Sequence, residues 1–407
     1  MVAENPISRR GKAFEEVRDT DGPRETGCDA HVPAPIPLLL HQLAHANSPA
    51  IQPVDPASHL SPIRLHSWIR GSSPLSDRRS CTRVAFARNV LYARIWTGHA
   101  MLSGRPLGAL AGLWLAGRLA PFTGNLLPMP LLALLDASFL LVLAAYLFRV
   151  LWKYRQKRNL VFPMLLAAMA ASNVLSYAGI RNRVGAAVGT ETMLWLVVLV
   201  VVLMGGRIIP SFTKNRFPQG TTRSRPMVNR WAIGLLVAAL LSDIAAWTRP
   251  DPALLFGAAA IANGLRLHDW FTREIRTDPL IWILHLGYAW LVLGLALHAG
   301  GHLGWCNPLL ARHAITVGAI GSITLGMMCR VTLGHTGRLI RASRLTNIAF
   351  VCVGLAATFR VLLPLVAPRA YLTGVNLSAV MWIVEFGLYL AEYGPILVKA
   401  RMDGQPG

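Results

Sequence analysis

The sequence predicts an all-α fold, a polytopic transmembrane helix bundle of about ten spans. Hydrophobic residues make up 54% of the 407 residues and charged residues only 14%, whereas a soluble protein usually carries about 25% charge. Apolar runs recur along the chain at close to the ~20 residues that a helix needs to cross a bilayer. Lysine and arginine gather in alternate connections between these runs, as cytoplasmic loops of membrane proteins do.

The predicted spans follow one another from residue 107 onward. They lie at 107–123, 129–150, 160–179, 188–210, 230–248, 253–268, 280–299, 309–332, 346–366 and 375–397. Each is too uniformly apolar for the alternation of a β-barrel strand. Helices are the expected form, because every backbone polar group inside a bilayer has to be hydrogen-bonded internally.

Residues 1–95 differ in composition from the rest. They are rich in proline, arginine, serine and histidine and contain no long apolar run, so we expect a disordered or aberrant segment. The start, MVAENPISRRGKAFEEV, lacks the apolar core of a signal peptide. The sequence therefore predicts two parts, an N-terminal segment 1–95 and a transmembrane domain 96–401.

The charge distribution predicts the orientation in the membrane. One set of alternate loops carries 21 lysines and arginines and the other set 6, so both termini are expected in the cytoplasm. Because the basic residues lie in these loops, the net charge of +21 does not indicate nucleic-acid binding. The five cysteines form no CxxC or CxxCH, which gives no support to a disulfide framework, a zinc ribbon or covalent haem attachment.

Ionisable residues inside predicted spans are functional hypotheses, because burying them in lipid is costly. The acids are Asp136, Asp243 and Glu385, and the histidines in or near spans are His285, His298, His313 and His335. For Asp136 and Glu385 we expect pairing with membrane arginines such as Arg118, with a part in proton movement as the alternative.

The stretch 313–338, HAITVGAIGSITLGMMCRVTLGHTGR, places a histidine near each end of one span. On an α-helix the 22 residues from His313 to His335 return to within about 40° of the same face, ~33 Å along the axis. Each histidine is a candidate metal or haem ligand, with interfacial polar residues as the alternative. The glycines between them permit close approach of a neighbouring helix. Gly334 is expected to break the helix before His335.

His285 lies on the preceding span, expected at a depth comparable to that of His335. Both are candidate axial ligands of a haem near the cytoplasmic face, with an ordinary core histidine as the alternative for His285. Arg330 and Arg338 flank His335 and could contact haem propionates. Arg207, in the helix end GGRIIPSF, could bind a propionate or a lipid phosphate.

His298 and His302 are weaker metal candidates. They lie four residues apart in HAGGH, and together with His313 they could form a copper site, since imidazole suits copper. Gly300 and Gly301 are expected to end the helix between them, and a solvated loop explains both histidines equally well.

Several of these motifs occur together in a fixed order. They are WLAGRLA (114–120), RNLVFP (158–163), GGRIIPSFTKN (205–215), ILHLGYAWLVLGL (283–295), the stretch 313–338 and YGPIL (393–397). In this order and spacing the chain resembles the NnrS family from Trp96 to about Arg401. The resemblance implies a protein of the bacterial cytoplasmic membrane that contains b-type haem and copper and takes part in the response to nitric oxide and nitrosative stress. It singles out His285, His313 and His335, and gives no support to His298 and His302.

The resemblance also implies about twelve helices, so the first two are apparently missing here. WTG (96–98) stands where these helices would end, and nothing before it resembles them. We expect that residues 1–95 derive from a wrong reading frame or a misassigned start; an intact, transcribed frame over 1–95 would contradict this.

The sequence leaves one alternative function open, which is a polytopic transporter of a metal or small solute.

Overall fold

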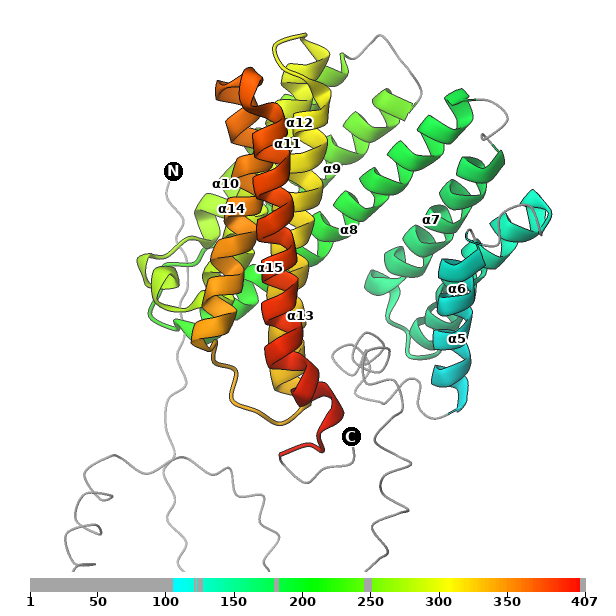
Figure 1. The fold of residues 1–407 in the computed structure, drawn as a ribbon, viewed down its shortest axis with the longest axis horizontal. Coiled ribbons are helices and arrows are strands. Elements are labelled where there is room, and N and C mark those ends of the chain that lie inside the picture. The colour runs from blue at the N-terminus through cyan, green and yellow to red at the C-terminus, as the bar shows by residue number, and fades with distance from the viewer. Residues whose placement is uncertain (1–104, 121, 123–126, 179–182, 245–250, 403–407) are drawn as a thin grey trace, which may run out of the picture. The chain divides into compact units, whose positions relative to one another are not determined.

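The computed structural model describes residues 105–120, 122, 127–178, 183–244 and 251–402, and within these ranges all regular structure is helical. The segment 1–95 lies outside the described residues. Figure 1 shows neighbouring helices packed along their lengths, with α8 running alongside α7. The all-α prediction is confirmed.

Each predicted span corresponds to a helix. The helices are α5 (Arg105–Leu119), α6 (Met129–Lys153), α7 (Val161–Ala178), α8 (Arg183–Arg216), α9 (Pro226–Ile244), α10 (Pro252–Trp270), α11 (Pro279–His302), α12 (Pro308–His313), α13 (Ser322–His335), α14 (Arg344–Val366) and α15 (Tyr371–Val398). A π-helical segment, Ala314–Gly321, joins α12 and α13 into one span. Short 3₁₀ turns precede α7, α11 and α15 at Lys157–Asn159, Arg273–Thr277 and Pro368–Ala370.

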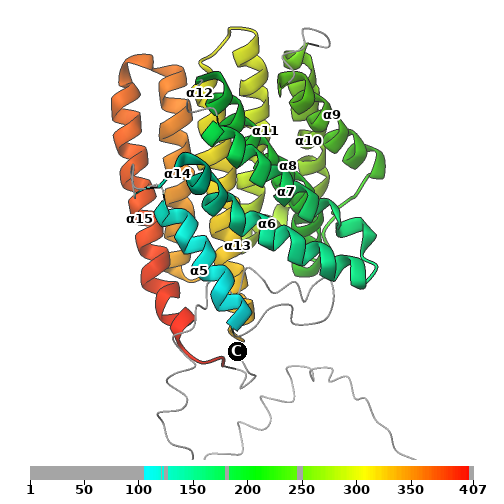
Figure 2. The same ribbon diagram turned by 90° about the vertical axis from the view of Figure 1, so that its right-hand side faces the viewer.

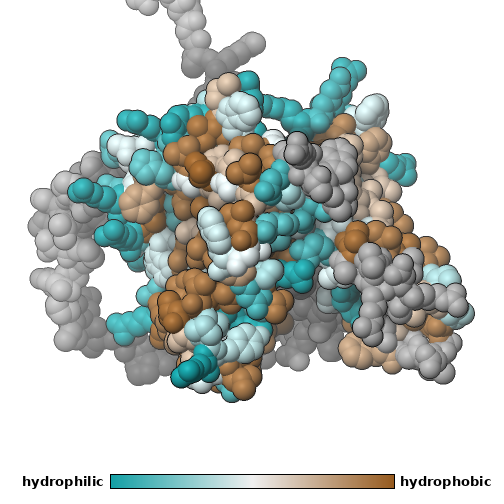
Figure 3. Space-filling model, turned by 90° about the horizontal axis from the view of Figure 1, so that it is seen from above, coloured by the Kyte–Doolittle hydropathy of each residue, from teal (hydrophilic) through white to brown (hydrophobic). Residues whose placement is uncertain are grey.

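Seven of the described helical spans are long and apolar enough to cross a membrane. They are α6, α7, α8, α11, the joined α12–α13, α14 and α15. Helices α5, α9 and α10 are only 15, 19 and 19 residues long, and each carries charged residues. Figure 3 shows large hydrophobic areas on the face in view. Exposed apolar side chains of the helices include Leu134, Met164 and Ile383. Such surface suits a lipid environment.

Three helices begin with the same capping motif. Asp251, Asp278 and Asn307 each accept a hydrogen bond from the backbone N–H two residues on. A proline follows each of them at the first helical position. The side chain satisfies a free N–H of the first turn, and proline has no N–H that would need satisfying there. The sequences DP, DP and NP therefore set where α10, α11 and α12 begin.

Consecutive helices pack side by side, as Figures 1 and 2 show for α14 with α15 and for α10 with α11. Helix α11 is the most enclosed, since it contacts α10, α8 and the α12–α13 span, and residues along its whole length are buried. The ILHLGYAW block therefore lies in the core of the bundle. Its burial explains why this block is apolar on every side.

A buried polar network replaces apolar packing where α10 meets its neighbours. The Arg266 guanidinium, 3% exposed, donates to Tyr288 Oη on α11 at 2.8 Å and to Asn263 Oδ1 at 3.2 Å. Its Nε donates to Asn229 Oδ1 on α9 at 2.9 Å, and the Trp270 ring lies 5.0 Å away. These bonds satisfy a cation that would otherwise be costly to bury, so α9, α10 and α11 are joined at one level.

The π-helical segment was not predicted, and it changes the geometry of the stretch 313–338. A π-helix closes its hydrogen bonds at i→i+5 and therefore fits more residues into each turn than an α-helix. The count of 100° per residue fails over Ala314–Gly321, so the predicted alignment of His313 and His335 on one face does not hold. π-Segments are rare and occur frequently at functional sites.

The helix end at His335 also differs from the prediction. Helix α13 continues through Gly334 to His335. It stops at Gly337, whose φ of 68° is readily adopted only by glycine. The Arg338 N–H then donates back to the Leu333 carbonyl at 2.9 Å, which is the closing bond of a Schellman motif. Gly337, and not Gly334, ends this helix.

Candidate metal centre

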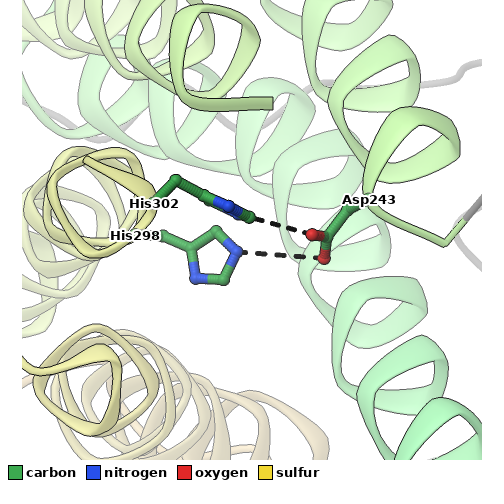
Figure 4. A group of neighbouring side chains, drawn as sticks. All are labelled: Asp243, His298 and His302. Carbon is green, nitrogen blue, oxygen red and sulfur yellow. Dashed lines mark ion pairs between the residues drawn. The ribbon is translucent and has the colours of Figure 1, made fainter. Parts of the chain in front are cut away.

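Three side chains meet at the ends of α9 and α11. Asp243 of α9 faces His298 and His302 of α11, as Figure 4 shows. The His302 Nε2 lies 3.3 Å from Asp243 Oδ1, and the His298 Nε2 lies 3.9 Å from Asp243 Oδ2. Among the described residues this is the only group of three or more His, Cys, Asp or Glu side chains arranged to hold a metal ion. We call it the His–Asp cluster.

Four helices enclose the His–Asp cluster. The ring of His298 packs edge-on against Trp195 of α8 and Phe256 of α10, with centroids 4.7 and 4.4 Å apart. His302 stacks on Phe256 at 5.9 Å and meets His298 at 4.9 Å. The side chain of His298 is 10% exposed and that of His302 30%. The aromatic rings therefore fix His298, while His302 leaves one side of the cluster open.

The pairing of the histidines corrects the prediction that Gly300 and Gly301 end the helix. Helix α11 runs on to His302, so two residues four apart lie on one face, the spacing of two histidines that share a metal. The turn that follows leaves ordinary contact distances at both glycines: a Cβ at Gly300 would lie 3.4 Å from Cys306 Sγ, and one at Gly301 3.4 Å from Pro308. Burial raises the pKa of the Cys306 thiol, which donates to the Leu297 carbonyl.

The cluster passes a simple test of fit for a metal ion. Its ligand atoms lie within 4.8 Å of one another. Ligands that share one ion at about 2.0–2.2 Å lie at most about 4.4 Å apart, so adjustments of less than an ångström would bring all three onto one ion. The Nε2 of His298 is buried and makes no hydrogen bond within the described residues. A buried imidazole nitrogen without a hydrogen bond is costly, and a metal ion shared with Asp243 would satisfy it.

His313 is not part of this group. It lies at the end of α12, half-buried, with the cations of Arg360 and Arg312 as its electrostatic neighbours. Arg312 itself pairs with Glu191 at 2.6 Å. The structure therefore replaces the predicted trio of His298, His302 and His313 with one in which Asp243 is the third member.

His285 and His335 lie on α11 and α13. The Nδ1 of His285 is 3.1 Å from the Ile281 carbonyl, which makes this nitrogen the N–H donor. Its Nε2 is buried without a hydrogen bond inside the described ranges. His335 is half-buried at the end of α13. Their ligand roles stay predictions.

The three predicted anion-binding arginines have different surroundings. Arg207 Nη1 donates to Asn159 Oδ1 at 2.7 Å, so it ties α8 to the turn before α7. The Arg330 guanidinium lies 4.0 Å from the centroid of the Phe212 ring, which makes a cation–π contact. The Nη1 of Arg338 is buried with no hydrogen-bond partner among the described residues.

The two intramembrane acids named with Arg118 have opposite outcomes. Arg118 pairs with Asp136, as predicted, and Asn173 and Tyr177 also donate to this carboxylate at 3.0 and 3.2 Å. This network borders a pocket of about 390 Å³ lined by residues of α5–α8. Glu385 pairs with no arginine; both of its oxygens are buried without a hydrogen bond in the part of the chain that the structure describes.

Sequence reasoning missed that Asp243 lies beside His298 and His302, although a signal was present. Helices α9 and α11 are two apart in an up-and-down order, so they run in the same direction. Asp243 near the end of one and His298 and His302 at the end of the other therefore lie at the same level. The assumed helix break at Gly300 hid this relation.

Comparison with known proteins agrees with the motifs. No curated protein and no solved structure matches the chain. The model of one family, described as NnrS protein, matches residues 92–401, which is well over half of the chain and includes every residue of the His–Asp cluster. The chain belongs to the NnrS family.

Proposed function

We propose that this protein is an integral membrane protein that binds copper at Asp243, His298 and His302 and acts in the response to nitric oxide. The geometry of the His–Asp cluster carries the metal-binding part of the proposal. The family carries the link to nitric oxide. The charge bias supports an orientation with both termini in the cytoplasm, and the family resemblance implies the bacterial cytoplasmic membrane.

The donor set suits transition metals rather than calcium or magnesium. Two imidazoles and a carboxylate bind zinc, copper, nickel and iron, and within this series Cu²⁺ is bound most tightly. Calcium and magnesium prefer sites made wholly of oxygen. Copper is also one of the two cofactors that the family resemblance implies.

The chain's own residues would hold and shield the ion. Asp243 supplies a negative charge that offsets part of the charge of the metal. Trp195 and Phe256 hold His298 in place and keep water from one side, and His302 stands at the open side. Copper held by these residues would supply one-electron chemistry toward nitric oxide. This arrangement suits binding or redox turnover of a small diatomic molecule.

The predicted b-type haem would have to fit between two closely packed elements. These are α11 and the span formed by the π-helical segment and α13. Added Cβ atoms at Gly287, Gly294, Gly318 and Gly326 would lie 2.6–2.7 Å from side chains across this interface. Trp290 and three isoleucines fill the space that a macrocycle would need. The residues there do not fit a haem, and we assign it no step. A Soret band that is lost in His285→Ala or His335→Ala would reinstate the predicted ligation.

The proposal is tested by metal analysis of the purified protein. We expect about one copper per chain after loading with Cu²⁺ and dialysis. His298→Ala, which removes one of three ligands, is expected to weaken copper binding by about 10–100-fold or more, the loss seen even when residues behind the ligands are changed. The matched control is His268→Ala, an exposed histidine in the last turn of α10 and outside the cluster, which should keep full affinity.

Two results would contradict the proposal. Equal copper affinity in His298→Ala, His302→Ala and the wild type would show that the cluster is not the site. Zinc bound in preference to copper would remove the redox role. Protein that inserts into membranes without copper or haem would favour the alternative of a transporter, which is then tested by solute uptake into vesicles.

A further inference from the structure

Glu385 occupies an unusual place for a carboxyl group. It lies halfway along α15 (Tyr371–Val398), about 20 Å from each end at 1.5 Å per residue, and is 0% exposed. Neither oxygen has a hydrogen-bond partner among the described residues. An unpaired carboxylate at this depth is costly, and ionisable residues inside a membrane mark ion pathways and proton relays.

A row of hydroxyl groups leads away from Glu385 along the same helix. Tyr389 and Tyr393 follow at steps of four residues, so they share its face of α15. They are 5% and 1% exposed, and their rings stack with centroids 5.0 Å apart. Because side chains on a helix lean toward its N-terminus, Tyr389 covers the turn that carries Glu385.

The row continues to the surface of the bundle through α14. The hydroxyls of Tyr393 and Thr346 lie 2.9 Å apart. Thr346 also contacts Glu392 Oε2 at 2.9 Å, and the exposed Ser343 donates to the same oxygen at 2.7 Å. A hydrogen-bonded series thus runs from solvent at Glu392 to the buried Tyr393.

The groups that face this row are neutral or acidic. From α13, Cys329 neighbours Tyr393, and Thr332 neighbours Tyr389. From α14, Cys352 is the titratable neighbour of Glu385. No salt bridge within the described ranges includes Glu385. A proton is therefore what would neutralise this carboxylate.

We propose that Glu392, Thr346, Tyr393 and Tyr389 form a proton path from the membrane surface to Glu385. Glu392 takes a proton from water and passes it to the Thr346 hydroxyl, which releases its own proton to Tyr393. Tyr393 and Tyr389 repeat the exchange. Because Glu385 accepts no direct hydrogen bond among the described residues, a water molecule carries the proton over the last gap, and the final O–H bond forms on Glu385. Each hydroxyl gains and loses one proton, so only the two carboxylates change charge.

The path begins at the end of α15 that the charge bias predicts to be cytoplasmic. It serves a process that consumes or moves protons inside the membrane. None of its residues belongs to the His–Asp cluster, so this proposal stands or falls separately from copper binding.

The path is tested by hydrogen exchange of the Glu385 carboxyl in the full chain, reconstituted in lipid. After a switch from H₂O to D₂O, infrared spectroscopy follows the C=O band of the protonated acid, which Glu385→Gln identifies by its loss. We expect exchange in Tyr393→Phe and Thr346→Val to be slower by about 10²-fold, the lower end of what a positioned proton-transfer group contributes.

Matched controls separate the path from general packing. Tyr371→Phe alters the other end of α15, and Thr358→Val removes a hydroxyl that bonds only its own helix at Gly354; both should exchange at the wild-type rate. Equal rates in all variants would overturn the proposal, as would the absence of any protonated Glu385 band from pH 5 to pH 9.

A second measurement needs no variant. A hydrophobic carbodiimide adds to protonated carboxyl groups inside membranes, and mass spectrometry of the α15 peptide locates the adduct. We expect modification at Glu385, decreasing as the pH rises. Labelling that spares Glu385 at every pH would contradict a protonated carboxyl at this position.

Discussion

Replacing Gly206 with alanine is expected to lower the free energy of unfolding by about 3 kcal/mol or more. A Cβ at this position in α8 would overlap Nη2 of Arg266, so the guanidinium would have to leave its place. Its hydrogen bonds to Tyr288 and Asn263 would break. Each buried polar group left without a partner costs about 1–3 kcal/mol, and a charged one more. Unfolding in detergent, followed by circular dichroism, measures the change.

Gly234→Ala is the matched control for this experiment. Gly234 also lies inside a helix, but a Cβ there would meet no atom within 4 Å. Alanine is the better helix former by about 0.5–1 kcal/mol, so this variant should be unchanged or slightly more stable. The double variant Gly206→Ala with Arg266→Met should lose less than the sum of the single changes, because both act on one network. Strict additivity would show that Gly206 acts through another contact.

Replacing Gly318 with alanine is expected to destabilise the protein by about 1–3 kcal/mol, the usual cost of overpacking a filled core. Gly318 lies in the π-helical segment, where a Cβ would come within 2.6–2.8 Å of three atoms of Trp290. Trp290 belongs to the buried α11 and cannot move away without disturbing that helix. The thermal midpoint of the variant in detergent measures the effect.

Gly334→Ala tests the same stretch at a position where there is room. The nearest atom to a Cβ there is Ile340 Cδ1 at 3.8 Å, so this variant should keep its stability. If the small residues instead made room for a haem, Gly318→Ala would reduce haem content and leave the apoprotein as stable as before. Comparing the two alanine variants therefore distinguishes a role of the glycines in helix packing from a role in cofactor binding.

Hydropathy and charge predicted the order and the type of the elements, because crossing a bilayer constrains the chain strongly. A run such as 346–366 needs no partner to be recognised as a span, and α14 covers Arg344–Val366. The helix starts at Asp251 and Asp278 also depend only on local sequence, a capping side chain followed by proline. Local chemistry of this kind acts over a few residues and is readable from the sequence.

The candidate site was predicted only in part. His298 and His302 were named as weaker candidates, while Asp243 was named only as an acid inside a span. Their meeting depends on α11 continuing past Gly300 to His302. Glycine by itself is equally consistent with a helix end and with a continuing helix, and only the folded structure decides between them.

By itself the sequence determined that this protein is a bundle of membrane helices with few ionisable groups inside, and its motifs identified the family. Tertiary structure decided which of those groups meet. In the folded protein Asp136 pairs with Arg118, while Glu385 pairs with no arginine among the described residues. Asp243 lies beside two histidines of another helix. The physical reason is that hydropathy depends on each residue alone, whereas pairing depends on the rotation and spacing of helices, which π-helical turns and glycine contacts set.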